Sequence, residues 1–121
     1  MHEGQTMRVP PDSTRKFETF GGESNFDAVF YAGGKISLRF GGINENGRRN
    51  GYKSLESGYL ERLAAHFSGR LVPPSATGEN AESIDQWIRE SGIQTRLSSY
   101  VCTLLVELGF AKRENDQLRF L

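Results

Sequence analysis

The sequence has little of several features that would place it in a specialised class. A single cysteine, Cys102, excludes an intrachain disulfide, and two histidines are too few to suggest a structural zinc site. No apolar run approaches the roughly eighteen residues that a membrane span needs. Residues 1–12 also lack the apolar core of a secretory signal. We therefore expect a soluble, cytoplasmic protein that uses no metal and no cofactor.

The chain also lacks an excess of either charge. Fifteen basic residues balance fifteen acidic ones, so the net charge gives no overall attraction to nucleic acid or to an anionic membrane. Any nucleic-acid contact must therefore come from a local basic patch. The 121 residues, of which 36% are hydrophobic, are enough to build one ordinary domain with its own core.

The first part of the chain is predicted to be a flexible arm followed by β-structure. Residues 1–14 are polar and carry two adjacent prolines, which is typical of a loose arm. In residues 15–53, short aromatic and β-branched runs are separated by glycine pairs, a pattern that predicts hairpins. Lys35–Phe40 is the clearest strand, because apolar and polar residues alternate along it. A polar loop is expected over residues 41–53.

This first part also holds a local excess of positive charge. Between positions 35 and 53 the only acidic residue is Glu45. The pattern predicts a phosphate-binding patch. The alternative interpretation is a solvated sheet face with a flexible loop, which would have the same composition. The basic residues are Lys35, Arg39, Arg48, Arg49 and Lys53.

Helical spacing replaces strand alternation in the second half of the chain. Apolar residues recur at every fourth position from Leu55 to Phe67, which predicts a helix over about 54–67. A loop is expected over 73–80. A second helix is expected over about 81–91, capped by Asn80 and burying Trp87 in the core. The remaining elements are predicted as a short strand at Leu71–Val72, a helix over about 95–108 and a hairpin over 110–120.

Two runs of the second half resemble a winged helix-turn-helix domain. Ser83–Ile93 is similar to its second helix and the turn that follows. Leu97–Arg113 is similar to its recognition helix running into the wing, and Leu104–Phe110 has the Leu-x-x-x-Gly-apolar step at which that helix often ends. The resemblance spans about residues 54–121. It implies an α+β fold in which an N-terminal β-meander (15–53) precedes a C-terminal winged helix-turn-helix, and the two could form one compact domain.

The resemblance implies a DNA-binding protein, such as a regulator of transcription or of a mobile element. Side chains at the start of a recognition helix read base edges in the major groove, and basic wing residues contact the phosphate backbone. The expected partner is double-stranded DNA, with homodimerisation left open. The recognition-helix positions are Gln94, Thr95, Arg96, Ser98, Ser99 and Thr103. The wing positions are Lys112, Arg113 and Arg119.

A second hypothesis is that the protein is an adaptor without enzymatic activity, since winged helices also dock proteins. The balanced charge favours the adaptor, whereas the two adjacent arginines and the basic wing favour DNA. An enzyme is not expected. Asp27 and Lys35 resemble a fragment of a PD-(D/E)xK nuclease motif, but the position two residues before the lysine is Gly33 and not an acid.

Overall fold

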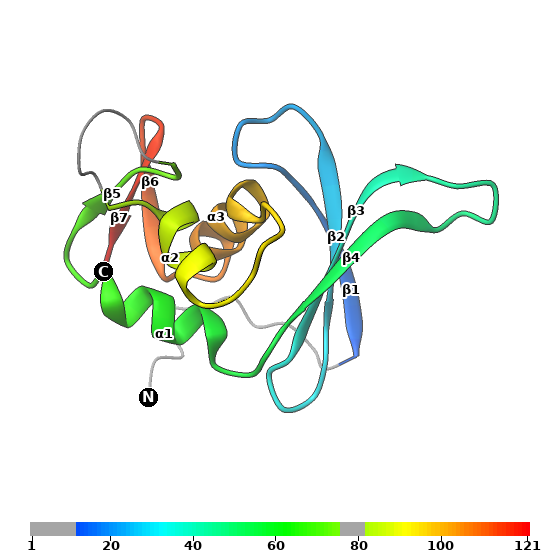
Figure 1. The fold of residues 1–121 in the computed structure, drawn as a ribbon, viewed down its shortest axis with the longest axis horizontal. Coiled ribbons are helices and arrows are strands. Elements are labelled where there is room, and N and C mark those ends of the chain that lie inside the picture. Colours follow the sequence, from blue (N-terminus) through cyan, green and yellow to red (C-terminus); the bar gives the residue numbers. More distant parts are fainter. Residues whose placement is uncertain (1–11, 76–81) are drawn as a thin grey trace.

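The computed structural model describes residues 12–75 and 82–121. These residues form a mixed α+β structure in which a four-stranded antiparallel sheet stands beside three helices and a small three-stranded sheet (Figure 1). The predicted arm therefore lies largely outside the described residues, as do Asn80 and most of the loop predicted at 73–80. The elements are β1 Ser13–Glu18, β2 Asn25–Phe30, β3 Ile36–Ile43, β4 Arg49–Leu55, α1 Tyr59–His66, β5 Leu71–Val72, α2 Ile84–Glu90, α3 Ser98–Glu107, β6 Ala111–Glu114 and β7 Gln117–Phe120.

The large sheet is a meander, because its strands pair in the order β1-β2-β3-β4. The loop predicted over 41–53 is wrong, since β3 continues to Ile43 and β4 begins at Arg49. The reason is that Gly41-Gly42 does not end the strand. These glycines form an irregularity between Phe40 and Ile43, and Gly41 takes a φ of 84° that favours glycine. In Figure 1 the resulting β3–β4 hairpin extends away from the helices.

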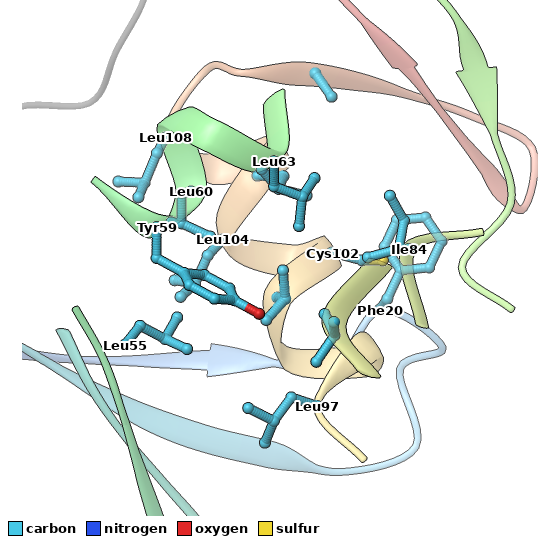
Figure 2. Close-up of a cluster of buried hydrophobic side chains, with 14 of the residues drawn as sticks. Phe20, Leu55, Tyr59, Leu60, Leu63, Ile84, Leu97, Cys102, Leu104 and Leu108 are labelled. Carbon is cyan, nitrogen blue, oxygen red and sulfur yellow. The ribbon is translucent and has the colours of Figure 1, made fainter. Parts of the chain in front are cut away.

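One hydrophobic core joins the inner face of the large sheet to the helices. Figure 2 shows side chains from β4, α1 and α3 meeting there, among them Leu55, Leu60 and Leu104, which are almost fully buried. At the sheet boundary the ring of Tyr100 from α3 stacks on Phe40, with centroids 4.8 Å apart. Because the core is continuous, the sheet and the helices are packed together as one body.

The first helix is shorter than predicted. It begins at Tyr59, whereas Leu55 belongs to β4 and lies opposite Ile36 of β3. Gly58, with a φ of 83°, separates strand from helix. The apolar stripe misled the prediction because Leu55 does face the same core as Tyr59 and Leu63, but it does so from a strand.

The remaining helices and the last hairpin follow the prediction with shifted ends. Ser83 caps α2 by accepting a hydrogen bond from the backbone N–H of Gln86 at 3.1 Å. Trp87 packs against the core as predicted but is only partly buried, and its ring lies edge-on to that of Tyr59 with centroids 5.3 Å apart. The hairpin of β6 and β7 is confirmed, and β5 joins it in the order β5-β7-β6.

Candidate nucleic-acid interface

The face of the large sheet that points away from the helices carries a polar hollow of about 500 Å³. Its position follows from strand alternation: Phe26, Ala28 and Phe30 of β2 face the core, so the residues between them face outward. We call this surface the outer-face hollow. It is lined by Thr14, Asp27, Val29, Tyr31, Lys35, Ser37, Arg39, Gly47, Arg48, Arg49, Gly51, Tyr52 and Ser54.

Arg49 is the structural brace of the outer-face hollow. Its Nε donates to an oxygen of Asp27 at 3.1 Å, and its other nitrogens donate to the side-chain oxygen of Asn25 at 2.7 Å and to the carbonyl of Gly41 at 3.2 Å. Only 8% of its side chain is exposed, against 26% for Asp27. Arg49 therefore ties β4 to β2 and to the bulge of β3, and its donors are already occupied.

The other cations of the outer-face hollow are not neutralised. Within residues 12–75 and 82–121, neither Lys35, Arg39 nor Arg48 has a carboxylate partner. The Nζ of Lys35 lies 5.8 Å from the centre of the Tyr31 ring, and Arg39 donates to the Tyr31 hydroxyl at 3.5 Å. Among the described residues, four cations line the hollow against one carboxylate, Asp27, which leaves three positive charges in excess. The hollow is thus a cationic surface with available donors.

Lys53 is not part of this surface. It lies opposite Leu38 in the register of β3 and β4, and cross-strand partners share a face. Its side chain is therefore on the inner side of the sheet, where the core begins. The five basic residues grouped by sequence separate into three free cations, one brace and one residue on the other face.

The predicted recognition helix, α3, is largely covered by the N-terminal sheet. The backbone N–H of Phe20 donates to the carbonyl of Ser99 at 3.0 Å, and the hydroxyl of Thr103 donates to the carbonyl of Glu18 at 2.8 Å. Ser98 is partly buried, and Glu107 is the one residue of α3 that is exposed. The helix therefore offers little free side-chain surface to a DNA groove.

The turn before α3 is more open. Gln94, Thr95 and Arg96 are exposed, and Arg96 has no ion pair in the described part of the chain. Arg96 and Ser98 line a second hollow together with α2 residues, where Arg89 is paired with Asp85 at 3.1 Å. This turn keeps the chemistry expected of a DNA contact, but with a single free cation.

The β6–β7 hairpin, predicted as the wing, uses two of its three basic residues internally. Arg113 donates to the carbonyl of Phe20 at 2.6 Å, and its guanidinium lies 4.0 Å from the centre of the Phe20 ring. Arg119 pairs with Glu114 at 3.2 Å. Lys112 is exposed and, among the described residues, has no ion pair. Arg113 thus holds the hairpin against the β1–β2 loop.

Asp27, Lys35 and Cys102 are further groups that could take part in catalysis or metal binding. Asp27 and Lys35 both line the outer-face hollow, but the Asp27 carboxylate is bound by Arg49. In the part of the chain that the structure describes, no three metal-ligating side chains gather at one point. Cys102 is fully buried, and this burial raises the pKa of its thiol well above the ordinary range.

Sequence reasoning missed the tyrosines of the outer-face hollow. Tyr52 is 74% exposed and lies opposite Arg39, and Tyr31 follows β2 on the same face. The signal was present, because Tyr52 and Ser54 alternate with the buried Leu55. This alternation has no meaning for the loop predicted over residues 41–53, because only the side chains of a strand alternate between two faces.

Comparison with known proteins adds no relative to this description. No family model, curated protein or solved structure matches the chain. Across the described residues, no helix has the length and apolarity required to cross a membrane.

Proposed function

We propose that this protein binds nucleic acid, with duplex DNA as the partner expected from its sequence, and that the outer-face hollow contacts the phosphate backbone. The observation that carries the proposal is the excess of three positive charges, on Lys35, Arg39 and Arg48, within one hollow. Basic side chains that lack internal partners are the groups that neutralise phosphates. In this proposal the zero net charge of the chain matters less than the local charge.

We further propose that residues 59–120 form a winged helix-turn-helix unit. Its support is the element order α1-β5-α2-α3-β6-β7 together with the sheet order β5-β7-β6, which places the first short strand against the last. In this chain the unit packs the predicted reading side of α3 against β1 and the β1–β2 loop. Its role is then to support the large sheet, and sequence reading by α3 is not required.

The number of free cations determines how steeply DNA binding should depend on salt. If three phosphates are neutralised, the logarithm of the binding constant falls with the logarithm of salt with a slope of about −2.7. Affinity would then decrease roughly 40-fold between 50 and 200 mM salt. Binding of this kind is weak and insensitive to sequence, because phosphate contacts carry no direct information about the bases.

The test is a fluorescence-anisotropy titration of the full chain with random-sequence duplex DNA at several salt concentrations. Two double variants locate the surface: Arg39→Ala with Arg48→Ala in the outer-face hollow, and Arg96→Ala with Lys112→Ala at the turn and wing. Each pair removes two exposed cations that have no ion pair among the described residues, so the two are matched in charge. The proposal predicts that the first pair weakens binding and reduces the slope by about two, and that the second does neither.

Two results would contradict this proposal. If only the second pair weakens binding, the DNA contact lies on the helix-turn-helix side. If the wild type binds no duplex even at low salt, the adaptor hypothesis takes its place. One observation favours the adaptor: the hydroxyl of Thr103, which was expected to contact DNA, donates to the carbonyl of Glu18 within the protein.

A further inference from the structure

We propose that the outer-face hollow is a stacking platform for an unpaired, single-stranded segment of nucleic acid, with Tyr52 as the principal stacking residue. This inference rests on the proposed function and goes further, because it names the form of nucleic acid that the surface selects. It depends on an arrangement of aromatic and basic side chains that a surface for phosphates alone would not need.

The arrangement crosses three strands of the sheet. Tyr52 of β4 lies opposite Arg39 of β3, and Arg39 lies opposite Asp27 of β2. Arg39 also reaches the hydroxyl of Tyr31, whose ring is approached by Lys35. The surface therefore presents Tyr52, Arg39 and Tyr31 in a row, with Arg39 between the two tyrosines.

The ring of Tyr52 is largely open to solvent. Its exposed fraction is 74%, and within the described residues its ring makes no contact with another ring or with a cation. By contrast, Tyr59 and Tyr100 are buried or partly buried and pack against Trp87 and Phe40. A solvent-exposed aromatic ring on a strand can stack against a planar ring of a binding partner.

The form of the partner follows from which atoms each nucleic acid exposes. In a duplex the faces of the bases are stacked inside, so a tyrosine ring meets only edges, sugars and phosphates. In a single strand each base can leave the stack and place its face on an aromatic ring while the backbone follows basic side chains. Tyr52 beside Arg39 and Arg48 supplies both contacts, so a single strand gains a contact that a duplex cannot make.

The size and floor of the surface agree with such a partner. A hollow of about 500 Å³ lies within the range that small ligands occupy, which suits one or a few nucleotides. Ser37 is buried in its floor and Ser54 lies opposite on β4, which places two hydroxyls among the basic groups. Hydroxyls of this kind can bond to phosphate or base atoms.

The experiment compares two probes with the full chain at one low salt concentration. The probes are fluorescein-labelled oligo(dT) of about 12 nucleotides, within the usual range of single-strand site sizes, and a labelled duplex of the same length. The variants are Tyr52→Ala, which removes the ring, and Tyr52→Phe, which keeps the ring and removes the hydroxyl. A thermal melt of each variant verifies folding, which an exposed side chain should not alter.

The inference predicts that wild type binds oligo(dT) more tightly than duplex. Tyr52→Ala should weaken oligo(dT) binding about ten-fold and duplex binding less than two-fold, since stacking of one base contributes on this scale. Tyr52→Phe should stay within two-fold of wild type on both probes. If duplex binds as well as oligo(dT) and Tyr52→Ala is without effect, the inference is wrong while the proposed function stands. If neither probe binds, the proposed function fails, and this inference fails with it.

Discussion

Substitution by alanine is expected to affect different properties at two adjacent arginines: stability at Arg49 and DNA binding at Arg48. Arg49→Ala removes a side chain that is 8% exposed, together with the hydrogen bonds that it donates to Asp27 and to the carbonyl of Gly41. A hydrogen bond to a charged group contributes about 1.5–3 kcal/mol. Because Asp27 keeps 26% of its side chain exposed, water can recover part of the loss. We therefore expect Arg49→Ala to destabilise the fold by about 2–3 kcal/mol, which lowers the melting temperature by roughly 10 °C.

Arg48→Ala changes an exposed side chain that has no ion pair in the described part of the chain. Its free energy of unfolding should stay within about 0.5 kcal/mol of wild type, while the salt slope of DNA binding should fall by about one. Chemical denaturation of both variants, monitored by circular dichroism, gives the stability, and anisotropy gives the slope. If Arg49→Ala is as stable as wild type, the brace assigned to Arg49 is refuted. If the two variants lose equal stability, the division of roles between them is refuted as well.

Three further predictions concern the core. Trp87→Ala should destabilise the protein by about 2–3 kcal/mol in urea denaturation, less than a fully buried tryptophan, because its ring is only partly buried and loses mainly its contact with Tyr59. Gly51→Ala should lower the melting temperature, since an added Cβ would lie 2.6 Å from the ring of Phe40; an unchanged melt would mean that the ring moves aside. Cys102 should resist Ellman's reagent until the chain unfolds, and because its pKa is raised in the folded state, stability should decrease above about pH 8.5 by up to about 1.4 kcal/mol per unit. Cys102→Ala should lack that decrease, and an equal decrease in both proteins would remove its assignment to this thiol.

Strands and helices with strong periodicity are predicted from the sequence. The prediction fails at glycine, which occurs both at the end of a strand and in a bulge within one. The strand at Lys35–Phe40 and the final hairpin are present because alternation and turn residues leave few alternatives. The pair Gly41-Gly42 predicts the end of a strand, but glycines also occur in bulges, as they do here. The outer face of β4 is therefore not recognised from the sequence. Local pattern does not separate these two uses of glycine.

The sequence predicts the basic composition of the candidate site, but not which of its residues form ion pairs within the fold. Arg48, Arg49 and Lys53 are close in sequence and look equivalent as a basic patch. Their roles diverge because Asp27 is brought to Arg49 from a strand more than twenty residues earlier, and because the register places Lys53 on the inner face. Likewise, the exposure expected for Thr103 was removed by its contact with Glu18 in β1. Contacts between distant segments decide which charges are free, and periodicity does not encode them.

The most direct test of the account is to map where nucleic acid lands on the folded protein. Amide chemical shifts of the isotope-labelled chain, followed during titration with oligo(dT), report each backbone position. We expect the largest changes at Arg39, Arg48 and Tyr52 on the outer face of the large sheet. Changes that cluster instead at Gln94–Ser98 and at Lys112, with the sheet unaffected, would contradict it.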